Sequence, residues 1–261
     1  MNILIIGDVY GHAGRAMIEK LINDVIKVEK ISFVICNAEN ITNGRGTSRE
    51  DYNFLKFHNV DVLTGGNHTF DHYETFDLLQ EKNDILRPAN YNKFTPGKGT
   101  VLINFAGIKI RVTNLLGRTF MNQNTNNFYE VMDDILENEE KANIHIVDFH
   151  GEASSEKIAF AHNYKNQLTA VVGTHTHVQT ADDQIIDEKL AYITDIGLTG
   201  AFHSIIGANT KEVIYREKTG MPIRLRTADG NGQFCAVVIK IDNNTYKPTE
   251  IKRIYLKNVA A

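Results

Sequence analysis

The chain contains little cysteine and no N-terminal hydrophobic run long enough to anchor it in a membrane. Its two cysteines, Cys36 and Cys235, each lie inside an apolar stretch, so the sequence offers no disulfide framework and favours a reducing compartment. The apolar run at residues 3–6 is stopped by Gly7 and Asp8, which makes it too short for a signal peptide or a membrane-spanning helix. We therefore expect a cytoplasmic protein that does not interact with membranes.

A strong excess of charge is also missing. The 28 Lys and Arg residues against 32 Asp and Glu residues give a formal net charge of −4, and both signs are spread along the chain. This distribution argues against a long electrostatic footprint on duplex nucleic acid, although it leaves a small phosphate ligand open.

Several common nucleotide-binding and nucleophile motifs are absent. The sequence has no Walker A motif and no G-x-S-x-G elbow. Gly7, Gly11 and Gly14 do not have the G-x-G-x-x-G spacing of a dinucleotide-binding loop, and Asp8 would repel a pyrophosphate there. A cysteine nucleophile is disfavoured because both cysteines lie in apolar runs.

Strand and helix patterns alternate over most of the chain, as in α/β proteins. We expect strands at residues 2–6, 32–36, 60–64, 100–105, 109–115, 144–149, 169–172, 233–241 and 250–256, and helices at 14–29, 48–58, 73–82, 128–141 and 154–163. Ser48 and Asp51 predict a capping box at the start of the second helix. No internal repeat, low-complexity tract or linker interrupts this pattern, so we expect one domain over residues 1–261, built on two sheets.

Side chains that can bind metals follow five of the expected strands, at the point where each strand ends. They are Asp8, Glu39 with Asn40, Asn67 with His68, His150, and His175 with His177. In open α/β sheets, ligands collect outside the carboxyl ends of the strands, and imidazole is the commonest neutral metal ligand. If the last strand continued through them, the i, i+2 spacing of the final histidine pair would place both rings on one face. The sequence therefore predicts a shared metal site at this edge.

These ordered residues resemble the motifs of the calcineurin-like metallophosphoesterases, and most closely those of the YmdB-like branch. The most specific segments are Gly66-Asn67-His68 and the ten residues 173–182, GTHTHVQTAD. The resemblance runs over nearly the whole chain and implies a four-layer α/β/β/α sandwich of two mixed sheets flanked by helices. It also implies an enzyme, a metal-dependent phosphodiesterase that hydrolyses small cyclic nucleotides, with the 2′,3′-cyclic type favoured.

The resemblance further implies a set of ligands for two metal ions. The wider superfamily begins with Asp-x-His, whereas this chain has Asp8-Val9-Tyr10. By similarity to the YmdB-like branch, Asn40 takes the vacant position and Glu39 bridges the metals. The first metal would then be held by Asp8, Glu39, Asn40 and His177, and the second by Glu39, Asn67, His150 and His175. This mixed set suits iron, manganese or zinc rather than calcium, and the resemblance favours iron.

The implied reaction is attack on phosphorus, in line with the leaving group, by a hydroxide that bridges the two metals. His68 resembles the catalytic histidine of the family, which would protonate the leaving oxygen; the alternative is a histidine that only supports the ligands. We expect a small cyclic nucleotide or a short RNA end as substrate, and the resemblance suggests a homo-oligomer. Two other functions stay open: a phosphomonoesterase, such as a nucleotidase or phosphoprotein phosphatase, and a non-enzymatic regulator that senses a nucleotide through its metal site.

Overall fold

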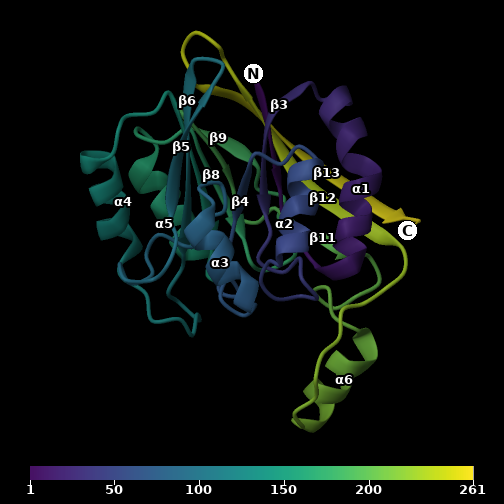
Figure 1. Ribbon diagram of the computed structural model, residues 1–261. Helices are drawn as coiled ribbons and strands as arrows, with labels where there is room; N and C mark the ends of the chain where they lie inside the picture. Colours follow the sequence, from purple (N-terminus) through teal and green to yellow (C-terminus); the bar gives the residue numbers. More distant parts are fainter. Residues whose placement is uncertain (261) are drawn as a thin grey trace.

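Two β-sheets packed face to face form the centre of the protein (Figure 1), and the computed structural model describes residues 1–260. The seven-stranded first sheet has the order β2 (Asp8–Val9), β11 (Leu198–Ala201), β12 (Gly232–Ile241), β1 (Asn2–Ile6), β3 (Ile31–Asn37) and β4 (Val62–Thr64), with β13 (Pro248–Val259) paired to β12. The six-stranded second sheet has the order β5 (Thr100–Phe105), β6 (Ile108–Leu116), β7 (Ile144–His150), β8 (Ala170–Thr174), β10 (Leu190–Ile193) and β9 (Gln184–Ile186).

Both sheets are mixed. In the first, β1, β3 and β4 run parallel, while β12 is antiparallel to β1 and β11. In the second, β6, β7, β8 and β10 run parallel, and the edge strands β5 and β9 are antiparallel to their neighbours. The carboxyl ends of the parallel strands therefore lie together within each sheet, where ligands collect in this class of fold.

The residues of β1 show why the strand is buried on both faces. Ile3 and Ile5 pack in the core between the two sheets, whereas Leu4 and Ile6 pack in the core beneath the helices. Because side chains alternate along a strand, an uninterrupted apolar run gives each face an apolar surface.

Helices cover the outer face of each sheet. The first sheet packs against α1 (Gly11–Val28), α2 (Arg49–Phe57) and α3 (Tyr73–Glu81), and the second against α4 (Phe128–Asn138) and α5 (Ser154–Tyr164). The result is a four-layer α/β/β/α sandwich, which confirms the fold class expected from the sequence. Within residues 1–260, no helix has both the length and the apolar character needed to cross a bilayer.

The elements missed by the sequence analysis are short or lack an apolar face. They are β2, β9, β10, β11 and α6 (Thr210–Thr219). Glu212 and Val213 are the only two buried residues of α6, so its sequence carries no helical apolar stripe. Figure 1 shows α6 extending away from the two sheets.

Of the two hydrogen bonds that define the predicted capping box, only one is present. Ser48 Oγ accepts from the Asp51 backbone N–H at 3.1 Å, as expected for an N-cap. The reciprocal bond is absent, because the Ser48 N–H donates instead to Thr42 Oγ1 at 2.7 Å. The Asp51 carboxylate accepts from Arg15 at 2.9 Å, so it ties α2 to α1.

Candidate metal centre

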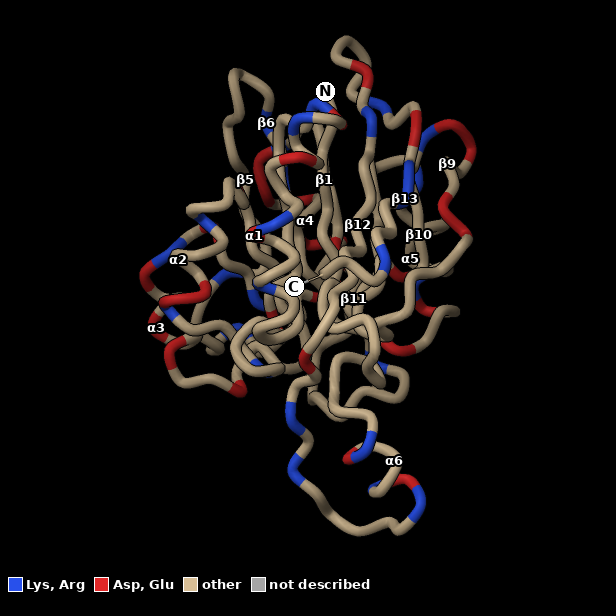
Figure 2. Tube along the Cα trace, turned by 90° about the vertical axis from the view of Figure 1, so that its right-hand side faces the viewer, with Lys and Arg blue, Asp and Glu red and all other residues tan. Residues whose placement is uncertain are grey.

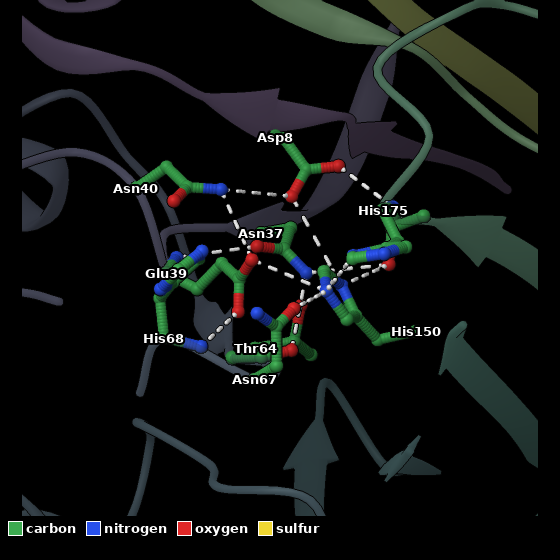
Figure 3. A network of polar contacts seen from close by, with 12 residues as sticks. Asp8, Asn37, Glu39, Asn40, Thr64, Asn67, His68, His150 and His175 are labelled. Atoms are coloured by element: carbon green, nitrogen blue, oxygen red, sulfur yellow. Dashed lines mark hydrogen bonds and ion pairs between the residues drawn. The ribbon is translucent and has the colours of Figure 1, made fainter. Parts of the chain in front are cut away.

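Four of the predicted side chains converge where β3, β4, β7 and β8 end (Figure 3). His150 Nε2 lies 2.9 Å from Asn67 Oδ1, 3.0 Å from His175 Nδ1 and 3.1 Å from Glu39 Oε1. Ligand atoms of Glu39, His150 and His175 all lie within 4.8 Å of one another. The structure thus brings together the four residues expected around the second metal.

The chemistry of this group suits a cation better than a set of hydrogen bonds. A ring nitrogen carries at most one proton, so His150 Nε2 can donate to only one of the three atoms that face it. A β-carbon at Gly66 would collide with Glu39 and His150, which explains why the close-packed group follows a glycine. Two imidazoles, a carboxylate and an amide oxygen form the mixed nitrogen and oxygen set that iron, manganese and zinc accept.

Asn40 joins the remaining predicted ligands into a second group that shares Glu39. Its Nδ2 lies 3.0 Å from Glu39 Oε1, 3.4 Å from His177 Nε2 and 3.5 Å from Asp8 Oδ1. His177 Nε2 and Asp8 Oδ1 are 3.7 Å apart. The side chains of Asp8 and Glu39 are almost fully buried, so this group holds two carboxylates away from solvent.

The orientation of Asn40 supports a cation in this second group. Asn40 Oδ1 is buried and has no hydrogen-bond partner among the described residues, and a buried polar atom left unpaired is costly. Turning the amide by 180° would exchange its oxygen and nitrogen and direct the oxygen toward Asp8 and Glu39. That arrangement places three oxygens together, which is favourable when a cation lies between them.

Hydrogen bonds behind two of the histidines fix which ring nitrogen faces the groups. His150 Nδ1 lies 2.9 Å from Thr174 Oγ1, and the Thr174 hydroxyl donates to Asp148 Oδ1 at 2.7 Å. Since this hydroxyl uses its proton on Asp148, it accepts from Nδ1–H and leaves Nε2 as a free donor atom for a metal. His177 Nδ1 donates to the Ile206 carbonyl at 2.9 Å, so Nε2 is the ring nitrogen that faces the second group.

The charged groups around the site shift one another's pKa. Burial acts to raise the pKa of Asp8, but His177 and His150 outweigh it and hold the Asp8 pKa below its ordinary value. Burial acts to lower the pKa of His177, but the Asp8 carboxylate outweighs it and raises the His177 pKa to about 9. The carboxylates therefore favour positive charge at this position, whether it is carried by the protonated His177 ring or by a cation that replaces the proton on His177 Nε2.

His68 stands beside both groups without joining either. Its backbone N–H donates to Glu39 Oε2 at 2.9 Å, and its Nδ1 lies 2.8 Å from Asp71 Oδ2. The ring is 34% exposed and lines the pocket in front of the ligands. A carboxylate on Nδ1 orients an imidazole and leaves Nε2 available for proton transfer.

Comparison with known proteins identifies the family. Residues 4–254 match the profile of the YmdB-like protein family. The chain belongs to the YmdB-like family. This confirms the resemblance found in the sequence.

Relatives within the YmdB-like family match this chain over almost its full length. It is 40% identical over 258 residues to the 2′,3′-cyclic-nucleotide 2′-phosphodiesterase of Bacillus subtilis, covering 99% of this chain and 98% of that protein. The crystal structure of a hypothetical protein from Thermus thermophilus superposes with a TM-score of 0.93 at 36% identity, covering 99% and 100% of the two chains. A Mycoplasma pneumoniae structure described as a novel phosphatase gives a TM-score of 0.93 at 35% identity, covering 98% and 93%.

His175 and His177 lie in a turn, whereas the sequence analysis considered them as part of a continuing strand. Strand β8 ends at Thr174, and both histidines have positive φ, 105° for His175 and 65° for His177. The prediction that strand alternation would bring the rings to one face was therefore wrong. The turn places them instead, and it directs one ring into each ligand group.

A buried ion pair beneath this turn was missed by the sequence analysis. Lys157, on α5, lies 3.2 Å from Asp195 Oδ2, and neither side chain has exposed surface. Lys157 Nζ also donates to the Thr174 carbonyl at 2.8 Å, while Asp195 Oδ2 accepts from the Thr176 N–H at 2.9 Å. The pair thus holds both sides of the turn in this YmdB-like protein. A lysine within an expected helix gives no signal of such burial.

The pocket in front of the ligands has a volume of about 320 Å³ and includes residues that the sequence did not indicate. Besides the ligands and His68, its lining contains Tyr10, which the sequence places at the same edge, and five residues that the sequence did not indicate: Arg45, Ile206, Val213, Arg216 and Leu225. Tyr10 replaces the histidine of the wider superfamily motif, and its ring lies edge-on to His177 at 5.6 Å between centroids. Four of the others lie on or beside α6, an element without a periodic pattern, so only the folded chain brings them to the site.

Proposed function

We propose that this YmdB-like protein is a two-metal phosphodiesterase that hydrolyses small cyclic nucleotides, with 2′,3′-cyclic nucleotides favoured. The observation that carries the proposal is the pair of ligand groups that share Glu39, with His68 beside them at the base of an open pocket. The name of the Bacillus subtilis relative supports the substrate class. The names of the relatives, phosphodiesterase and phosphatase, support a phosphoester hydrolase in general.

In this proposal, one metal is held by Asp8, Glu39, Asn40 and His177, and the other by Glu39, Asn67, His150 and His175. Divalent cations bound there would supply Lewis-acid charge, which lowers the pKa of water and neutralises the phosphate. The shared carboxylate of Glu39 would offset the repulsion between the two neighbouring cations. Iron is favoured by the family resemblance, with manganese and zinc as alternatives.

His68 is proposed as the general acid. When the bond between phosphorus and the ribose 2′ oxygen breaks, that oxygen needs a proton. The protonated His68 ring would donate it from Nε2, while Asp71 holds the ring at Nδ1. Water adds to phosphorus, the proton goes to the 2′ oxygen, and a nucleoside 3′-phosphate results. The same contact with Asp71 keeps the ring directed into the pocket.

Comparing two substrates with the same leaving group tests the reaction class. With manganese added, turnover of bis-p-nitrophenyl phosphate should exceed that of p-nitrophenyl phosphate, and adenosine 2′,3′-cyclic phosphate should be hydrolysed. Chelator should abolish both activities, and metal analysis of protein purified without chelator should give two ions per chain. A clear preference for the monoester would favour the phosphomonoesterase, and binding of nucleotide without turnover would favour the regulator.

Two further features of the protein belong to the proposal. We place the enzyme in the cytoplasm, which the two free, buried cysteines support. We also propose that residues 1–261 act as one domain, since a single buried cluster joins residues of both sheets.

A further inference from the structure

The pocket in front of the metal ligands is lined by both polar and aliphatic residues. The polar lining includes Glu39, Asn40 and the histidines, and the aliphatic lining comes from Ile206, Val213 and Leu225. These three aliphatic residues lie in residues 202–231, between β11 and β12. We call this segment, which includes α6, the arm. Figure 2 shows the arm extending beyond the two sheets.

Several hydrogen bonds fix the base of the arm relative to the metal ligands. The Phe202 N–H donates to the Asn231 carbonyl at 2.9 Å, which closes the arm where it leaves the sheet. The Ile206 carbonyl accepts from His177 Nδ1 at 2.9 Å. Ile206 has φ of 48°, a rare conformation for a β-branched residue, and strained residues of this kind cluster at functional sites. Ile206 is therefore held at a set position beside His177, a ligand of the second group.

Two of the three aliphatic residues of this wall remain accessible, and the third supports them from beneath. Ile206 is 56% exposed, and Leu225 is half-buried. Val213 is buried on the inner side of α6, where it supports the wall. A pocket that combines an aliphatic wall with charged groups suits a ligand with one anionic and one apolar part.

Two guanidinium groups line the same pocket. Arg45 comes from the loop after β3, and its one ion pair among residues 1–260 is a distant contact with Asp71 at 3.9 Å. Arg216 comes from α6 and pairs with its neighbour Glu217 at 3.2 Å. Both side chains are well exposed, so they are available to a phosphate or to the face of an aromatic ring. The ligand is therefore anionic, and its other end is apolar or aromatic.

We infer that the arm forms a nucleobase subsite, in which Ile206, Val213 and Leu225 pack against the base while the phosphate lies at the metal ligands. This inference rests on the proposed function. It assigns a binding site to the base, the part of the substrate that lies away from the reacting phosphate. A volume of about 320 Å³ is in the range of pockets that hold one small ligand. Because aliphatic side chains carry no hydrogen-bonding groups, the wall binds purines and pyrimidines alike.

Two cyclic diesters that differ in the base separate this role from the chemistry. Adenosine 2′,3′-cyclic phosphate and glycerol 1,2-cyclic phosphate share the five-membered cyclic phosphate, but only the first carries a base. Leu225→Ala and Val213→Ala should each lower kcat/KM for the adenosine substrate about tenfold, the usual effect of removing a small apolar contact. The loss should appear in KM rather than kcat, since contacts to the base are equal in the ground and transition states. Turnover of the glycerol substrate should not change.

Matched control variants lie on the same arm. Ile214→Ala and Ile223→Ala remove exposed aliphatic side chains outside the pocket, so both substrates should be hydrolysed as by the wild type. Circular dichroism of all four variants checks that the arm substitutions leave the fold intact. Equal losses for both substrates, or no loss for either, would overturn the nucleobase subsite.

A binding measurement without metal tests the nucleobase subsite independently of enzymatic activity. In chelator, adenosine 3′-phosphate should show saturation transfer by NMR from the protein to its base protons, and Leu225→Ala should weaken it while Ile223→Ala does not. Transfer that is unchanged by Leu225→Ala would contradict the subsite. If the wild type hydrolyses neither cyclic substrate but this pattern of transfer is seen, the proposed function fails and the subsite stands.

Discussion

Replacing Lys157 by methionine should destabilise the protein by about 3–5 kcal/mol, the usual cost of removing one partner from a buried ion pair. Lys157 and Asp195 have no exposed side-chain surface, and Nζ also donates to the Thr174 carbonyl at 2.8 Å. Methionine keeps the apolar stem but removes the cation. The Asp195 carboxylate then stays buried without its counter-charge, and the Thr174 carbonyl loses a donor.

Urea unfolding followed by far-UV circular dichroism measures this loss. Lys165→Met is the matched control, because Lys165 lies at the end of the same helix and pairs with Asp187 at the surface; its effect should be far smaller. The double variant Lys157→Met, Asp195→Asn should recover part of the loss, since no lone charge is left buried. Metal affinity of Lys157→Met should also fall, because the turn bearing His175 loses its support. A change below about 1 kcal/mol would refute the reasoning.

Three further predictions concern the site and the pH dependence of stability. His68→Ala should keep its metal content and lose about 10²–10⁴ in kcat; loss of metal instead would make His68 a ligand. Asn40→Ala should retain one of two metals, as determined by metal analysis, and retention of both with unchanged affinity would contradict its ligand role. Burial, with a smaller effect of Arg111, lowers the pKa of His145 from 6.5 to about 3, so the unfolded chain binds an extra proton between these values. Stability measured by urea unfolding should fall as pH drops through this window, by up to about 1.4 kcal/mol per unit, and His145→Gln should flatten the slope.

The central strands and the outer helices could be predicted because their side chains carry strong local patterns. The expected strand at residues 2–6 is present as β1, whose uninterrupted apolar run is explained by burial on both faces. Strands β9, β10 and β11 have only three or four residues each. Segments that short form through pairing with distant neighbours, so a local pattern gives little signal for them.

The convergence of the candidate metal ligands could be predicted from the sequence, but the residues that support them could not. Asp8, Glu39 and His150 follow recognisable strands, and all parallel strand ends meet at one edge. Lys157 gave no such signal, because burial of its ammonium group depends on Asp195, 38 residues later. The wall formed by the arm depends likewise on how a polar helix folds back beside the ligands.

The place of β12 in the first sheet has a consequence for synthesis of the chain. β1 lies between β3 and β12, and Asn2 pairs with Lys240. During translation β1 therefore has only one of its neighbours until nearly the whole chain has left the ribosome. β2, which contains Asp8, waits in the same way for β11, where Leu198 is its partner. The Asp8 side chain, a candidate metal ligand, is consequently fixed late in synthesis, because a nascent chain ending before β11 lacks the strand that pairs with β2.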